Sequence, residues 1–158
     1  MNMKTISIGL GNPILGDDAI GCRAAEILKT QFQTMGIDLV EIEPFYRGGI
    51  SLMERLIGYD QALILDSIQV MGGQPGRVVE LSLTDLPPKT VNSPHDATLL
   101  VAVELGRQLG EKLPERIDIL GVEIESEYEF TDQLSQPVME ALPRLIQKAI
   151  EWTEKYAG

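Results

Sequence analysis

The chain has 158 residues, 44% of them hydrophobic, which fits one compact domain over residues 1–158 with a sizeable core. Its formal charge of -11 argues against binding nucleic acid or an anionic membrane and favours basic or metal-bearing partners, although acidity can also serve solubility alone. The single cysteine, Cys22, cannot form an internal disulfide and no apolar run approaches the roughly 20 residues of a membrane span, so we expect a cytoplasmic protein.

In chain order, the first predicted element is a strand over residues 4–10 that ends at a glycine-rich turn. A helix is predicted from Ala19, where apolar residues recur at helical spacing, and it closes at Gly36. Residues 37–42 alternate apolar and acidic side chains, which predicts a half-buried second strand.

The middle of the chain predicts a short helix over residues 51–57 and then a continuous apolar run over residues 62–66. Such a run is typical of a central strand covered on both faces. A turn at residues 72–76 leads to the alternating segment 77–83. We expect segments 62–66 and 77–83 to pair as an antiparallel hairpin.

A third helix is predicted to open with Ser93 as its N-cap and Pro94 at its first position. The apolar spacing in this helix gives a predicted core face of Leu99, Val103 and Leu109. Residues 117–124 supply the fifth strand. The last helix starts near Gln136 or Pro137 and carries a long apolar stripe.

Strands that alternate with helices predict an α/β fold: a three-layer α/β/α sandwich with a five-stranded, mainly parallel twisted sheet including one antiparallel strand. In such sheets, binding sites lie outside the carboxyl ends of the parallel strands. This rule selects residues 12–18, residues 45–49 and Asp66.

The loop after the first strand, "GLGNPILGDDAIG", begins like a dinucleotide-binding loop, with Gly9 and Gly11. The third glycine position holds Ile14, however, and Asp17 and Asp18 stand at the helix entrance where a phosphate would bind. Two carboxylates there would repel phosphate. Helix capping explains one of the two acids, and we expect this of Asp17, with support of Asp18 as its alternative role.

Asp18, Asp66 and His95 are the candidate catalytic and metal-ligating residues. Asp66 follows a buried strand, where a carboxylate is costly unless it is solvated, paired or ligating. His95, the only histidine, is expected in a helix's first turn, where the positive helix end keeps the imidazole neutral. Two carboxylates and an imidazole suit zinc, nickel or manganese with open coordination positions. An ordinary hydrogen bond of His95 is the alternative.

Other chemistries fit less well. The chain has no Gly-x-Ser-x-Gly nucleophile elbow, and one histidine excludes a His-Glu-x-x-His zinc protease. Cys22 could pair with His95 as a nucleophile, but its place about a turn into the first helix favours a buried small side chain.

Four motifs together resemble the maturation endopeptidases of [NiFe] hydrogenases: "GLGNPILGDDAIG", "ALILDSI", "SPHDATL", and "ILGVEIES" followed by "LSQPV". They occur in order over nearly the whole chain. The resemblance implies a cytoplasmic endopeptidase that removes the C-terminal extension of a [NiFe] hydrogenase large-subunit precursor after nickel insertion. It also implies that Asp18, Asp66 and His95 contact nickel supplied by the substrate.

Several alternatives stay open. The ion could polarise the scissile carbonyl or activate water, or an aspartate could act as general base. A non-enzymatic metal-binding chaperone of the large subunit is the alternative function, and a monomer is expected.

Many members of the family carry a loop that is similar to Asp-Gly-Gly-Thr, and the resemblance implies that this loop helps to select the precursor. This chain has Arg47 before its glycines instead. Asn12 is expected to hold its loop, or substrate, by hydrogen bonds.

Overall fold

The computed structural model describes residues 3–70, 72–83, 94–125 and 129–157, and for residues 94–98 the backbone alone. The strands are β1 (Thr5–Leu10), β2 (Glu41–Phe45), β3 (Gln61–Gln69), β4 (Val78–Ser82) and β5 (Arg116–Ile124). The helices are the 3-10 helix η1 (Gly16–Ala19) and α1 (Ile20–Met35), α2 (Gly49–Leu56), α3 (Pro94–Gln108) and α4 (Gln136–Tyr156).

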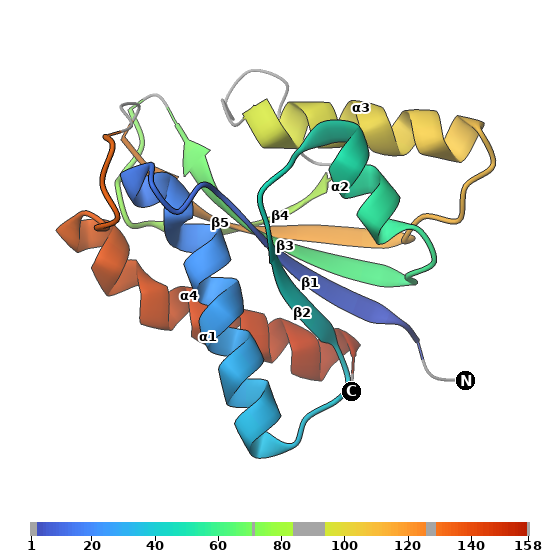
Figure 1. The fold of residues 1–158 in the computed structure, drawn as a ribbon, viewed down its shortest axis with the longest axis horizontal. Coiled ribbons are helices and arrows are strands. Elements are labelled where there is room, and N and C mark those ends of the chain that lie inside the picture. Colours follow the sequence, from blue (N-terminus) through green and yellow to red (C-terminus); the bar gives the residue numbers. More distant parts are fainter. Residues whose placement is uncertain (1–2, 71, 84–93, 126–128, 158) are drawn as a thin grey trace.

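The strands form a five-stranded sheet in the order β2-β1-β3-β5-β4, in which only the β4–β5 pair is antiparallel (Figure 1). Helices α1 and α4 cover one face of the sheet, and α2 and α3 cover the other. The predicted fold class is therefore confirmed. As predicted from its apolar run, β3 lies in the middle of the sheet and pairs with β1 and β5.

The predicted hairpin is wrong, because β4 pairs with β5 and not with β3. Strand β5 is buried along almost its whole length, whereas β4 is half-buried with Glu80 exposed. A continuously apolar strand gains more from a place between two neighbours, and an alternating strand suits an edge. Burial thus puts β5 next to β3 and sends β4 to the outside.

The second strand also begins later than predicted, at Glu41, because the pairing with β1 starts at Ile6 opposite Glu41. Residues 37–40 form the link from α1, although Ile37 and Val40 still pack against the core. The core face of α3 holds Leu99 and Val103 as predicted. Leu109 is 71% exposed, since it lies beyond the last residue of that helix.

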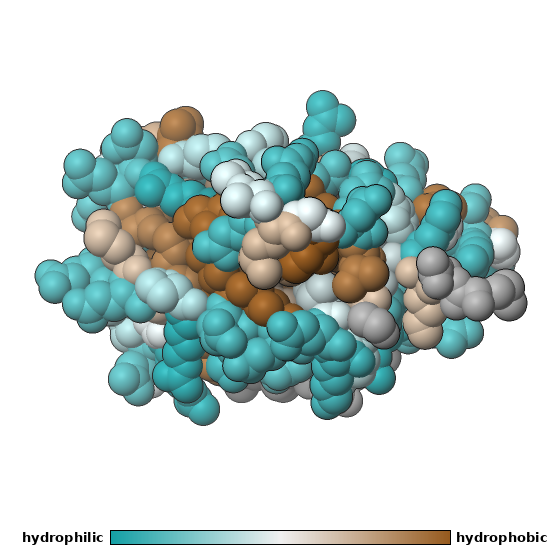
Figure 2. Space-filling model, turned by 90° about the horizontal axis from the view of Figure 1, so that it is seen from below, coloured by the Kyte–Doolittle hydropathy of each residue, from teal (hydrophilic) through white to brown (hydrophobic). Residues whose placement is uncertain are grey.

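Residues of β3 alternate between two hydrophobic clusters, as the strand period requires. Leu63 and Leu65 pack under α1 and α4, and Ala62 and Ile64 pack under α2 and α3. Seen from the side of α1 and α4, apolar surface remains visible between rows of hydrophilic side chains (Figure 2). Among the described helices, none combines the length and the apolarity that crossing a membrane requires.

Candidate active site

Strand β1 is shorter than β3, and the candidate site lies beside the point where β1 ends. The β1–β3 pairing ends at Gly9 opposite Leu65, whereas β3 continues beside β5 as far as Gln69. Asp66 is thus the first residue of β3 beyond its pairing with β1, and it is fully buried. The expectation that Asp66 ends its strand is wrong, but it does lie where the neighbouring strand ends.

The start of α1 sits directly on this end of the sheet. A Cβ atom built at Gly21 would overlap the carbonyl oxygens of Leu10 and Leu65, so a larger residue would push the helix away. Gly11, with φ of 147°, likewise meets the carbonyl oxygen of Asp18. The glycines of this loop therefore serve close packing between helix and strand, which brings Asp18 next to β3.

Ser67 joins the two candidate carboxylates. Its hydroxyl donates a hydrogen bond to Asp18 Oδ1 (3.1 Å), and its backbone N–H donates to Asp66 Oδ1 (2.8 Å). The second oxygen of Asp18 accepts from the Asn12 backbone N–H (2.9 Å). Asp18 is 4% exposed and Ser67 3%. Sequence reasoning missed Ser67, although its place directly after Asp66 is a signal that could have found it.

Asp17 has a different role from Asp18. Its two carboxylate oxygens accept hydrogen bonds from the backbone N–H and the hydroxyl of Ser135, each at 2.7 Å. Ser135 is the N-cap residue of α4, so Asp17 fixes the loop to another helix and does not cap its own. The expected loop-holding role of Asn12 is confirmed, because its Oδ1 accepts from the Ile14 N–H (3.1 Å).

His95 lies in the first turn of α3, and its side chain is outside the described residues, as is the expected N-cap Ser93. Helix α3 leads into β5, which begins at Arg116 opposite Gln61, the first residue of β3. The last turn of α3 is therefore near the end of the sheet where β3 begins. Its first turn points toward the opposite end of the sheet, where β3 ends (Figure 1).

Strand alternation places Asp66 on the same face of the sheet as Ala62 and Ile64, which is the face that α2 and α3 cover. The backbone of His95 thus approaches from the layer that Asp66 faces. Among the described side chains, no cluster of three or more His, Cys, Asp or Glu could hold a metal ion. The structure describes two of the three predicted ligands, and each of these two accepts a hydrogen bond from Ser67.

Cys22 is buried and its Sγ donates to the Ala19 carbonyl oxygen (3.1 Å). Burial raises the pKa of the Cys22 thiol to about 11, with a further contribution from the nearby charge of Glu26. A thiol with this pKa is protonated at neutral pH, so it is a poor nucleophile. The interpretation of Cys22 as a buried small residue is confirmed.

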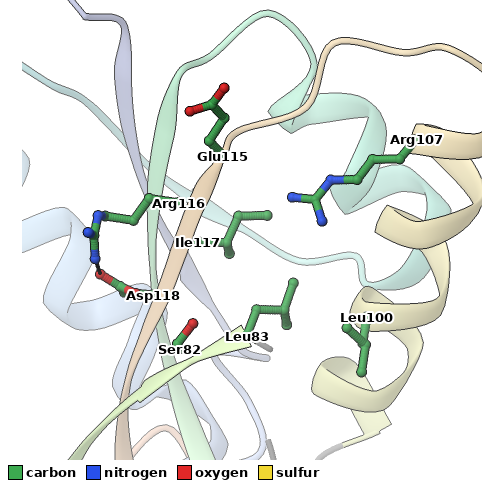
Figure 3. A pocket seen from close by; sticks show the side chains of 8 residues that line it. All are labelled: Ser82, Leu83, Leu100, Arg107, Glu115, Arg116, Ile117 and Asp118. Carbon is green, nitrogen blue, oxygen red and sulfur yellow. Dashed lines mark hydrogen bonds and ion pairs between the residues drawn. The ribbon is translucent and has the colours of Figure 1, made fainter. Parts of the chain in front are cut away.

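A cleft of about 410 Å³ opens beside the Asp17 side of the loop, between residues 16–17 and the segment before α4. A smaller pocket of about 220 Å³ lies between α3 and the first half of β5 (Figure 3). Asp118 lines this pocket and pairs with Leu63 in the sheet, roughly 10 Å along β3 from Asp66 at 3.3 Å per residue. The smaller pocket is therefore separate from the candidate site.

The chemistry available at the candidate site follows from these contacts. Two carboxylates, oriented through one serine, present oxygen atoms that can bind a divalent cation or accept a proton from water. Among the described residues, neither an arginine nor a lysine forms an ion pair with Asp18. The hydrogen bonds that the structure describes for Asp18 come from neutral donors.

Comparison with known proteins gives one family. A model of the family "Hydrogenase maturation protease" matches residues 23–152, a range that includes Asp66 and His95 and begins after Asp18. The "Hydrogenase 2 maturation protease" of Escherichia coli K12 is 31% identical over 126 residues, which is 78% of this chain and 75% of that protein.

Solved structures agree with the family in their fold. The hydrogenase maturating endopeptidase HybD from E. coli is 24% identical with a TM-score of 0.78, covering 97% of this chain and 93% of that one. The [NiFe] hydrogenase maturation protease HycI from Thermococcus kodakarensis KOD1 is 26% identical with a TM-score of 0.69, covering 94% and 91%.

Proposed function

The chain belongs to the hydrogenase maturation protease family and is therefore a processing peptidase, and from this premise we propose that it cleaves the C-terminal extension from a [NiFe] hydrogenase large-subunit precursor once nickel has been inserted. Asp18, Asp66 and His95 contact the nickel that the precursor carries, so the ion is part of the substrate. The enzyme acts in the cytoplasm as a monomer.

The observation that supports this proposal is that Asp18 and Asp66 both accept hydrogen bonds from Ser67, beyond the end of the β1–β3 pairing. Carboxylate oxygens are suitable ligands for a divalent ion, and a neutral imidazole from the first turn of α3 would complete a mixed oxygen and nitrogen set. Three protein ligands leave coordination positions for groups that already hold the ion in the precursor.

The protein groups bind and orient, and the nickel marks the correct precursor. A nickel-free precursor lacks the atom that the carboxylates contact, so it binds too weakly to be cut. In the loaded complex, the ion supplies positive charge near the scissile peptide. The ion can polarise the scissile carbonyl or activate the attacking water, or an aspartate can take the proton of that water and pass it to the leaving amine.

The experiment that tests the proposal incubates the purified protein with nickel-loaded and with nickel-free precursor and measures the mass of the large subunit. Loss of the extension from the loaded form alone is the expected result. Cleavage of both forms would remove nickel sensing from the proposal. Binding without any loss of mass would replace the endopeptidase by a non-enzymatic chaperone of the large subunit.

The loop between β2 and α2 is proposed to contribute to the choice of precursor. Arg47 is exposed in this loop, at the same end of the sheet as the candidate site, beyond the carboxyl ends of β1 and β2. An exposed guanidinium favours an acidic element of the partner. Replacing Arg47→Asp should change the relative cleavage rates of several precursors, and unchanged ratios would refute this contribution.

A further inference from the structure

Helix α3 is apolar on its outer side as well as on the side that faces the sheet. Val101, Leu105 and Leu109 follow one another at intervals of one helical turn, and they are 65%, 43% and 71% exposed. Leu109 continues this row past the end of α3, because its N–H still donates to the Leu105 carbonyl oxygen (3.0 Å). A helix that is apolar on opposite sides is normally covered on both. The outer row is therefore a candidate contact surface.

Helix α2 lies beside α3 on the same face of the sheet and runs in the same direction (Figure 1). A Cβ atom built at Gly106 would lie 3.0 Å from the sulfur of Met53. Further along both chains, the Gly58 N–H donates to the Lys112 carbonyl oxygen (2.9 Å). Ile50 lies one turn before Met53 and is 56% exposed, so it stands on the side of α2 that faces α3.

The outer row of α3 borders the groove between the two helices. Leu100 and Arg107 lie on one flank of α3 and line the pocket beside β4 and β5 (Figure 3), whereas Gly106 on the other flank contacts α2. At about 100° per residue, the outer row falls between the solvent side of α3 and the flank that contacts α2. The exposed apolar side chains of the two helices thus form one surface, which we call the α2–α3 face: Ile50, Val101, Leu105 and Leu109.

Acidic side chains border the α2–α3 face on both helices. Glu54 follows Ile50 by one turn of α2, and Glu104 lies beside the outer row of α3. Both are exposed, and neither forms an ion pair with any residue that the structure describes. Arg107, one turn after Glu104, donates instead to the Pro114 carbonyl oxygen (2.9 Å). The face therefore combines apolar contact area with negative charge that a cationic partner can neutralise.

This combination selects among the possible occupants of the face. An anionic membrane surface is disfavoured by the formal charge of -11 and by the two bordering acids. A second copy of the chain is disfavoured because a symmetric dimer would bring the acidic borders of both copies into one interface. An amphipathic helix fits the groove with its apolar side, and lysine or arginine on its flanks fits the acids.

We propose that the α2–α3 face docks the folded part of the precursor through an amphipathic helix of that protein with lysine or arginine on its flanks. The inference rests on the proposed function, because the occupant is the proposed substrate. Continuity with the candidate site argues for this occupant: α2 follows the carboxyl end of β2, and the first turn of α3 points to the same end of the sheet as Asp18 and Asp66 (Figure 1). The face contacts the precursor away from the peptide bond that is cut.

The first test removes apolar area from the face and keeps the helix, since leucine and glutamine have similar helix propensities. Leu105→Gln with Leu109→Gln should raise KM for nickel-loaded precursor about tenfold with kcat little changed, because this contact is equal in the bound substrate and in the transition state. Met35→Gln with Leu39→Gln changes two exposed apolar residues near the start of β2 and should keep the wild-type KM. Thermal unfolding checks that both variants are folded.

The second test compares two variants that change the net charge equally. Glu54→Lys with Glu104→Lys reverses the acids beside the face, and Glu26→Lys with Glu154→Lys reverses exposed acids on α1 and α4, across the sheet. The first variant should bind precursor several-fold more weakly than the second at low salt, and this difference should fall as salt is added. Equal binding by the two variants would refute the basic flanks of the partner helix.

Binding of a precursor from which the C-terminal extension has been deleted separates this inference from the proposed function. Weaker binding of this truncated precursor to the Leu105→Gln, Leu109→Gln variant than to wild type, measured by calorimetry, supports docking even if no cleavage occurs. If wild type cleaves loaded precursor and the variant keeps its KM, the docking surface is refuted and the proposed function stands. A wild type that sediments as a dimer, with a monomeric variant, would assign the face to a second copy and overturn the proposal.

Discussion

Two buried aspartates at opposite ends of the sheet have opposite surroundings. Asp18, at the carboxyl end, is 4% exposed and accepts hydrogen bonds from the neutral groups of Asn12 and Ser67. Asp118, near the amino end, is 6% exposed and lies 3.3 Å from the Arg116 guanidinium, while the indole N–H of Trp152 donates to it at 2.8 Å. Burial alone therefore does not separate a functional carboxylate from a structural one.

The difference lies in the counter-charge. A buried carboxylate that contacts a guanidinium and an indole N–H is already neutralised and hydrogen-bonded within the protein. It therefore has little charge or hydrogen-bonding capacity for a ligand. The Arg116 guanidinium also lies 4.1 Å from the centre of the Tyr156 ring, so this cluster fastens the end of α4 to β5. A carboxylate held by neutral donors keeps its charge for a cation.

The largest expected effect is that of Asp18→Asn on activity. The amide keeps the size of the side chain but removes the charge that contacts nickel, so the cleavage rate of loaded precursor should fall about 100-fold or more. The melting temperature should change by only a few degrees. Mass spectrometry and thermal unfolding measure the two quantities, with Asp38→Asn as an exposed control. A rate near that of wild type would contradict the assignment of Asp18.

Asp118→Asn should have the opposite signature. It leaves the Arg116 guanidinium without its carboxylate in a partly buried place, so the free energy of unfolding should fall by about 2–3 kcal/mol. The kcat of the folded enzyme should be unchanged below the melting temperature. Urea denaturation and steady-state kinetics test this pair of outcomes. A large loss of kcat with unchanged stability would contradict the structural role of Asp118 and its difference from Asp18.

A smaller effect is expected for the contact between Asp17 and Ser135. Each of Asp17→Asn and Ser135→Ala should lower the free energy of unfolding by about 1 kcal/mol, because each removes part of an exposed hydrogen-bonded pair. The double variant should lose less than the sum of the two, since the residues share one contact. Strict additivity, measured in a double-mutant cycle, would show that the contact contributes nothing.

The smallest effect is expected for Cys22→Ala, at about twofold or less in cleavage rate. The raised pKa of about 11 means that deprotonation begins only well above neutral pH, and at pH 8 about one thiol in a thousand is ionised. Iodoacetamide at pH 8 should therefore leave the folded enzyme active. Inactivation in proportion to alkylation of Cys22 would show that the site at the carboxyl end of the sheet uses a thiol as well as carboxylates.

Sequence periodicity was sufficient for much of the fold. Local patterns predicted three features: the end of α1 at Gly36, the continuously apolar β3 and the start of α4 at Gln136. They could do so because the spacing of apolar residues within a segment indicates which of its residues are buried. The rule that sites lie beyond parallel strands selected Asp18 and Asp66, and both accept hydrogen bonds from Ser67, while their role as a site stays a prediction. The role of His95 remains a prediction.

Only the tertiary structure decided which strands are neighbours and what each polar side chain contacts. The place of β5 between β3 and β4 depends on how much area each strand buries in the whole sheet, and no turn sequence encodes it. The contacts of Asp17 with Ser135 and of Asp18 with Ser67 join residues 118 and 49 positions apart. Local patterns determine which face of an element is buried, but partners at such separations are set by the packing of the complete chain.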